Sequence, residues 1–140
     1  MELSICVLAY NHPELLNDCL ASIDAQKIPC SYEKVLVDNG STPSLAVPQG
    51  WRSIYVDPNQ GHIRGQNLCF EHAQGTWVLF VANYVRMKKD CLKLMWTEGV
   101  GRYGIAQPTL ITKHEQIDNT GLQWRWPGYG ISQRCTNRLA

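Results

Sequence analysis

The sequence lacks both a long hydrophobic run and an excess of charge of either sign. Its longest apolar run, Trp77–Ala82, is far shorter than the roughly 20 residues that a helix needs to cross a bilayer. The 13 basic and 12 acidic residues leave a formal charge of +1, whereas nucleic-acid-binding proteins usually carry a basic stripe. The chain opens with strand-like sequence, so we expect no signal peptide. We therefore expect a cytoplasmic protein with no membrane span and no nucleic-acid partner.

Metal-binding and redox cysteine pairs are also missing. None of the six cysteines is spaced as C-x-x-C, which argues against a zinc site. Four fall in predicted strands or helices, where a free thiol acts as a small apolar residue: Cys6, Cys19, Cys69 and Cys91. Cys30 and Cys135 lie in loop-like sequence, where a thiol is able to react or pair.

The hydrophobic pattern predicts one α/β domain over residues 1–140. Three runs are continuously apolar, which is typical of parallel strands with helices on both sheet faces: Leu3–Ala9, Val35–Val37 and Val78–Ala82. A further strand is predicted over Ser53–Val56. Residues at helical spacing predict three helices: from Pro13 to near Gln26, from near His62 to Gln74, and over Asp90–Glu98.

The pattern changes in the last third of the chain. Ile105–Ile111 predicts one strand, and Ile117–Trp126 predicts another with a bulge or turn inside it. Three aromatic residues lie near the end of the chain: Trp124, Trp126 and Tyr129. We expect them to cover an edge of the sheet, and the alternative is that they form a stacking platform for a sugar.

Polar residues follow each of the first three predicted strands. Tyr10-Asn11-His12 comes after the first, Asp38-Asn39-Gly40-Ser41 after the second, and Asn59-Gln60-Gly61 after the third. Open α/β sheets bind ligands at the carboxyl ends of their strands, so these segments indicate a nucleotide site. Two alternatives remain open: Asn11 or His12 caps the next helix, and Asp38 begins an ordinary turn.

Segment 59–67 is neither a P-loop nor a dinucleotide fingerprint, because its glycines are too far apart and no G-K-[ST] follows. It places His62, Arg64 and Gln66 around a predicted helix start, where one of them is able to meet a phosphate. Residues of this kind more often lie at the surface without contacting a ligand.

Together and in this order, the three loops resemble the N-terminal half of family 2 glycosyltransferases of the GT-A fold. That family opens with Thr-Tyr-Asn and Arg-Pro-x-x-Leu, and this chain has Ala9-Tyr10-Asn11-His12-Pro13-Glu14-Leu15-Leu16. Its Val-Asp-Asn-Gly-Ser-Thr segment matches Val37–Thr42 here. Its Asn-x-Gly, second Asn and Ala-x-Gly match Asn59-Gln60-Gly61, Asn67 and Ala73-Gln74-Gly75. The match covers residues 3–82 and weakens toward Gly121.

The resemblance implies a truncated, Rossmann-like GT-A domain with a mostly parallel central sheet and helices on both faces. It also implies a nucleotide-sugar donor of the UDP or dTDP type. Three residues would hold the base and ribose: Tyr10, Asn11 and Asp38. Two would line the same pocket: Asn39 and Ser41. Four would approach the ribose and diphosphate: Asn59, Gly61, Arg64 and Asn67.

The chain departs from the family at the usual metal site. There the family carries Asp-x-Asp or Asn-x-Asp, whose last carboxylate binds Mn²⁺ or Mg²⁺, whereas the aligned residues here are Ala82-Asn83-Tyr84. Hard divalent cations prefer carboxylate oxygens, so we expect the usual Mn²⁺ or Mg²⁺ ligands to be absent. The departing diphosphate then needs other cations, for which the candidates are His62, Arg64, Lys88 and Lys89.

The general base of the family, usually Asp or Glu, has no matched counterpart. Weak candidates for catalytic roles are Asp90, Asp118 and Arg64. The acceptor-side elements are unmatched, and whether a second copy or a partner chain completes that side stays open. Two functions remain open: a hexosyl-type glycosyltransferase with an unknown acceptor, narrowly favoured, and a catalytically silent nucleotide-sugar-binding or structural module within a larger assembly.

Overall fold

The computed structural model describes residues 1–119, 122–125 and 129–132. It divides the chain into two compact units, Met1–Asp90 and Cys91–Ala140, and each is described by itself. The expectation of a single domain stays a prediction. Cys135, Trp126 and the side chains of Trp124 and Tyr129 lie outside the described residues. None of the described helices is long and apolar enough to cross a membrane.

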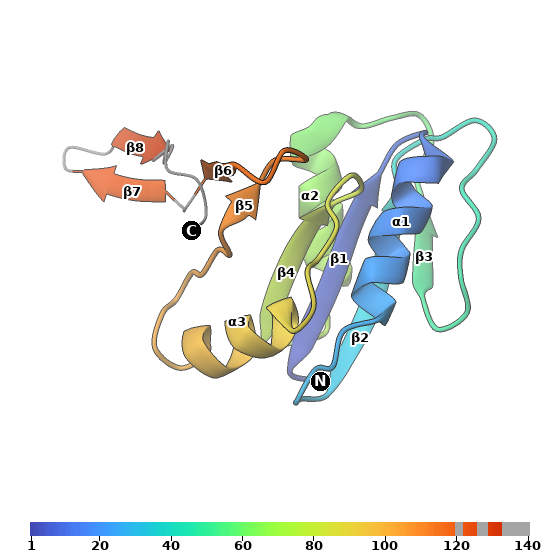
Figure 1. Ribbon diagram of the computed structural model, residues 1–140. Coiled ribbons are helices and arrows are strands. Elements are labelled where there is room, and N and C mark those ends of the chain that lie inside the picture. The colour runs from blue at the N-terminus through green and yellow to red at the C-terminus, as the bar shows by residue number, and fades with distance from the viewer. Residues whose placement is uncertain (120–121, 126–128, 133–140) are drawn as a thin grey trace. The chain divides into compact units, whose positions relative to one another are not determined.

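The first unit is built on a four-stranded parallel sheet (Figure 1). Its strands are β1 (Leu3–Ala9), β2 (Tyr32–Asp38), β3 (Arg52–Tyr55) and β4 (Trp77–Ala82). The order across the sheet is β3-β2-β1-β4. β1 is therefore an inner strand, in which Leu3 lies opposite Tyr32 on one side and Trp77 on the other. The predicted α/β sheet is confirmed.

Two helices cover opposite faces of this sheet (Figure 1). α1 (Pro13–Asp24) joins β1 to β2, and α2 (Gly61–His72) lies between β3 and β4. The core on the α2 face contains five buried residues: Cys6, Leu8, Val35, Val37 and Cys69. Because side chains alternate along a strand, Ile5 and Val7 point to the other face. There α1 buries four residues: Leu16, Cys19, Leu20 and Ile23.

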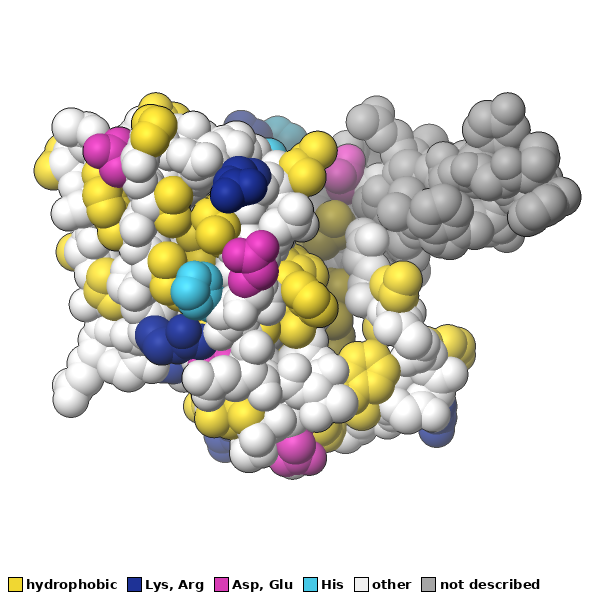
Figure 2. Space-filling model, turned by 180° about the vertical axis from the view of Figure 1, so that it is seen from behind, with side chains coloured by type: hydrophobic (Ala, Val, Ile, Leu, Met, Phe, Trp, Pro, Cys, Tyr) yellow, Lys and Arg dark blue, Asp and Glu magenta, His cyan; other side chains and the backbone are white. Residues whose placement is uncertain are grey.

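The α2 face keeps some apolar surface in contact with solvent. Phe70 on α2 is 65% exposed and Phe80 on β4 is 45% exposed. Figure 2 shows this face, with hydrophobic side chains lying among basic and acidic ones. α2 therefore covers the inner strands more completely than it covers β4.

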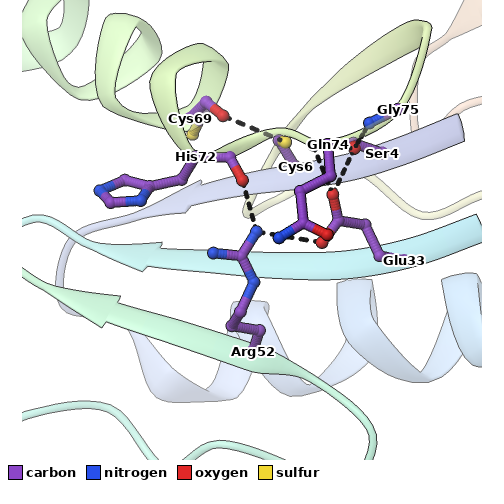
Figure 3. Close-up of polar contacts among 8 residues, drawn as sticks. All are labelled: Ser4, Cys6, Glu33, Arg52, Cys69, His72, Gln74 and Gly75. Carbon is purple, nitrogen blue, oxygen red and sulfur yellow. Dashed lines mark hydrogen bonds and ion pairs between the residues drawn. The ribbon is translucent and has the colours of Figure 1, made fainter. Parts of the chain in front are cut away.

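A hydrogen-bonded cluster ties the strands together at the amino end of the sheet (Figure 3). The Ser4 hydroxyl donates to Glu33 Oε1 at 2.6 Å, and the Arg52 guanidinium donates to Glu33 Oε2 at 3.0 Å. The Gln74 N–H donates to Glu33 Oε1 at 2.7 Å, and Arg52 also donates to the His72 carbonyl. Partial burial alone would raise the pKa of the Glu33 carboxyl, but these hydrogen bonds outweigh it and lower the pKa.

In its described residues, the second unit contains one helix and two antiparallel strand pairs. Its elements are α3 (Cys91–Gly99), β5 (Leu110–Ile111) paired with β6 (Ile117–Asn119), and β7 (Leu122–Arg125) paired with β8 (Tyr129–Ser132). The strand predicted over Ile105–Ile111 is wrong up to Thr109, since only Leu110 and Ile111 pair. Pro108 accounts for the difference, because proline has no N–H to donate to a neighbouring strand.

Five cysteines in the described part of the chain are free thiols: Cys6, Cys19, Cys30, Cys69 and Cys91. Three of the four that were predicted to act as small apolar residues are fully buried, whereas Cys91 is only partly buried. Burial raises the pKa of Cys19 to about 11. This thiol is therefore protonated at neutral pH and unreactive as a nucleophile.

Candidate functional site

The polar segments that follow β1, β2 and β3 meet at the carboxyl end of the sheet. The Asn39 N–H donates to the Ala9 carbonyl at 2.8 Å, and the Val56 N–H donates to the Asp38 carbonyl at 2.9 Å. These two bonds continue the parallel ladder beyond the strands and hold the three loops together. The proximity that the sequence predicts is confirmed.

Asp38 holds the loop after β2 in shape from the inside. The residue is 2% exposed, Oδ1 accepts a hydrogen bond from the Ser41 N–H at 3.0 Å, and Oδ2 accepts one from the Leu45 N–H at 2.8 Å. Both bonds run from the Asp38 carboxylate to its own loop, and a role of Asp38 toward a ligand stays a prediction. A carboxylate oxygen has a second lone pair, so Asp38 still has acceptor capacity.

Asn11 and Ser41 join the β1 loop to the β2 loop. Ser41, only 1% exposed, accepts a hydrogen bond at Oγ from the Asn11 N–H at 2.8 Å, and the Thr42 N–H donates to Asn11 Oδ1 at 3.4 Å. Asn11 and His12 both have φ of 53°, which is uncommon for residues other than glycine. His12 is the N-cap residue of α1 and makes no side-chain capping bond. Since Asn11 bonds to Thr42 instead, the helix-cap alternative is wrong.

The first turn of α2 opens onto a cavity of about 530 Å³. Its lining consists of Gln60, Gly61, His62, Ile63, Arg64 and Asn67. The first N–H groups of a helix have no intrahelical partner and carry the positive end of the helix dipole, so this end favours an anion. Arg64 is exposed and adds a full positive charge.

A second cavity, of about 430 Å³, lies between the β2 loop and β3. Its lining consists of Asp38, Ser41, Thr42, Pro43, Ser44, Leu45, Val47, Ser53 and Tyr55. Five of the nine predicted donor-binding residues line one of these two cavities, whereas Tyr10, Asn11, Asn39 and Asn59 line neither. Asp38 and Ser41 line this cavity, whereas Gly61, Arg64 and Asn67 line the cavity at α2.

The end of β4 does not supply the family's usual metal ligands. β4 ends at Ala82, and Tyr84 is 70% exposed. Among the residues that the structure describes, no group of three His, Cys, Asp or Glu side chains is placed to hold a metal ion. The side chains of Ala82 and Tyr84 do not fit a hard divalent cation, which needs several oxygen ligands.

The segment after β4 runs back along α1 toward the amino end of the sheet (Figure 1). The Met87 N–H donates to Ser22 Oγ at 3.0 Å, and Gln26 Nε2 donates to the Lys88 carbonyl at 3.1 Å. Gln26 follows the last turn of α1, which lies at the amino end because α1 leads into β2. The structure therefore does not bring residues 88–90 to the donor loops, and Asp118 belongs to the other unit.

Leu45 and Gly65 shape the site and were not among the predicted residues. A Cβ on Gly65 would lie 2.6 Å from Leu8 Cδ1, so glycine lets α2 approach the sheet closely. Because glycine is disfavoured inside a helix, Gly65 within a helical pattern was the sequence feature that could have indicated close packing. Leu45 gave none, because it acts through its backbone N–H.

The sequence model of Glycosyl transferase family 2 matches residues 4–138. With the parallel sheet and its three joined loops, this match defines the class of the protein. The chain belongs to the family 2 glycosyltransferases, and the resemblance seen in the sequence is confirmed.

This chain matches only part of the length of each similar protein. The structure of S. aureus TarS 1–349 in complex with UDP-GlcNAc has a TM-score of 0.59 and 23% identity, covering 79% of this chain and 40% of that one. Its complex with UDP has a TM-score of 0.58 and 23% identity, with 79% and 42% covered. These likenesses show the fold. A TPR repeat-containing protein of Synechococcus elongatus is 27% identical over 100 residues, 69% of this chain and 23% of that protein. The chain spans less than half the length of these relatives.

Proposed function

We propose that this chain binds a nucleoside diphosphate sugar of the UDP or dTDP type at the carboxyl end of its sheet. The observation that carries the proposal is the hydrogen-bonded junction of the three loops, where Asn11 is joined to Ser41 and Gln60 to Asn39. The similar protein TarS has been solved with UDP-GlcNAc and with UDP, which supports a ligand of this class. Buried free thiols suit a reducing compartment, so a cytoplasmic location is part of the proposal.

The base and ribose need a flat apolar surface and a few hydrogen-bonding groups. Tyr10 is 48% exposed and offers its ring for stacking, and the Asn11 amide is next to it in the chain. Asp38 is the negatively charged acceptor of the group. Asn39 and Ser41 are buried and keep these residues in place.

The diphosphate needs positive charge and backbone N–H groups. The first turn of α2 supplies the N–H groups of His62 and Ile63, since the Gly61 N–H already donates to Asn59 Oδ1. Gly61, at φ 78°, has no side chain to cover this end of the helix. Arg64 and His62 are the nearest candidate cations in the chain, and Asn59 and Asn67 supply amides. The proposal needs no contribution from the residues at the family's metal positions.

In the transferase form of the proposal, the sugar passes to an acceptor hydroxyl while Arg64 and α2 stabilise the leaving diphosphate. The proposed base is Asp118 or Asp90, and a second copy or a partner chain completes the acceptor side. The alternative is a catalytically silent binding module. Two observations favour the alternative: Ala82 and Tyr84 replace the metal ligands, and Asp90 lies away from the loops.

The test is titration of the chain with UDP and UDP-GlcNAc, followed by calorimetry and NMR. We expect shifts at Tyr10, Asn11 and Arg64. Arg64→Ala should weaken UDP binding about tenfold, as loss of a hydrogen bond to a charged group usually does. Lys27→Ala removes the same charge from an exposed site at the amino end of the sheet and should have no effect. Absence of shifts at all three residues would contradict the proposal.

A further inference from the structure

The Asn39 side chain sits between the β2 loop and the start of α2. The residue is 3% exposed, and its Oδ1 accepts a hydrogen bond from the Gln60 N–H at 2.9 Å. Its Nδ2 donates to the Gly61 carbonyl at 3.2 Å and to Asn59 Oδ1 at 3.3 Å. One buried amide therefore bonds to three consecutive residues of the turn that begins α2.

Two glycines make room for this arrangement. A Cβ on Gly40 would lie 2.6 Å from the Asn59 backbone nitrogen, and a Cβ on Gly65 would lie 3.3 Å from Asn39 Nδ2. Any other residue at position 40 would push the turn outward, and φ of 85° there also favours glycine. The turn is therefore held close to β2 by sterics as well as by hydrogen bonds.

The backbone that Asn39 holds in place belongs to the start of α2, which is the part of the site that favours an anion. Gln60 and Gly61 line the cavity at the start of α2, together with Arg64. Asn59 Oδ1 also accepts the Gly61 N–H at 2.7 Å, so the side chains of Asn39 and Asn59 jointly fix the orientation of this backbone. Small displacements of groups that must meet a ligand in one geometry weaken binding steeply.

We propose that Asn39 is a positioning residue that sets the start of α2 for the diphosphate of the donor. This inference rests on the proposed function and adds to it a division of labour within the site. Asn39 itself does not touch the diphosphate, because its three hydrogen-bonding contacts are made to the protein. It acts through Gln60 and Gly61.

The experiment compares the affinities for UDP and for uridine, because only UDP carries the diphosphate. Asn39→Ala should lower the affinity for UDP about tenfold and change that for uridine much less. NMR hydrogen exchange of the Gln60 N–H should accelerate at the same time. The matched control is Asn17→Ala, which removes an exposed amide from α1 and should leave both affinities unchanged.

The outcomes separate this inference from the proposed function. If the unchanged protein binds neither UDP nor uridine, both ideas fail. If it binds UDP and Asn39→Ala lowers both affinities equally, or neither, the inference alone is overturned. Gly65→Ala is the second variant, since its methyl group pushes on Leu8 and Asn39 while every Asn39 atom stays. If Asn39→Ala does not fold, a selective loss of UDP affinity in Gly65→Ala supports the inference and an unchanged ratio overturns it.

Discussion

Replacing Asp38 by asparagine tests whether the β2 loop depends on a buried carboxylate. The two carboxylate oxygens accept N–H groups from Ser41 and Leu45, at 3.0 and 2.8 Å. Asparagine has one acceptor oxygen and one NH₂ group, so one of these N–H groups must face another donor. A buried N–H without a partner costs about 1–3 kcal/mol. We expect the free energy of unfolding to fall by that amount.

The measurement is urea unfolding with linear extrapolation, accompanied by calorimetric titration with UDP. UDP binding should weaken too, because Ser41 holds the Asn11 turn. Asp38→Ala removes both acceptors and should weaken UDP binding by about 1–3 kcal/mol. The control Glu71→Gln makes the same chemical change at an exposed position and should stay within about 0.5 kcal/mol of the unchanged protein. An Asp38→Asn variant as stable as this control would refute the assigned role of the carboxylate.

Three further predictions concern the metal, turnover and pH. The affinity for UDP should be nearly equal in EDTA and in Mn²⁺, and binding that EDTA abolishes and Mn²⁺ restores would contradict this expectation. Changing Ala82 and Tyr84 together to Asp should make UDP binding depend on the metal. The isolated chain should transfer sugar from UDP-GlcNAc very slowly or not at all, since loss of positioned acid–base catalysis alone costs about 10²–10⁴-fold; robust turnover in a product assay would show an unrecognised base. Glu33, whose pKa is lowered by folding, should stabilise the protein above pH 4.5, its unperturbed value, and lose that contribution as the pH falls through the lowered pKa. Glu33→Gln should flatten this part of the pH dependence in urea unfolding, and an unchanged profile would be evidence against it.

The inner strands of the parallel sheet were predictable because β1 and the end of β2 are buried on both faces. Leu3–Ala9 is fully buried, so its continuous apolar sequence has a direct physical cause. The start of β2 was not predictable in the same way. Glu33 and Lys34 are polar because they bond to Ser4 and Asp24, and such partners are distant in sequence. A polar residue of this kind looks the same in a loop and in a strand.

The candidate site was predictable as a set of neighbouring loops, but the task of each residue was not. Parallel strands bring their carboxyl ends to one edge, so Asp38 and Asn11 had to be close. Whether Asp38 points to a ligand or back to its own loop depends on whether the Leu45 N–H comes close to its carboxylate. The local sequence pattern does not predict that position. The positions of Lys88 and Asp90 were equally hidden, since they follow from hydrogen bonds of the preceding segment to α1.

The position of β1 also has a consequence for how the chain folds during synthesis. β1 is synthesised before both of its partner strands, yet it pairs with β4 as well as with β2. Its bonds to Trp77 and Ala82 must wait until most of the first unit has been made. Contacts between residues so far apart in sequence form slowly, and an apolar strand without its partner is prone to aggregation in the meantime. The β4 side of β1 therefore stays unpaired until Ala82 has been made, and during that interval its apolar sequence is open to aggregation.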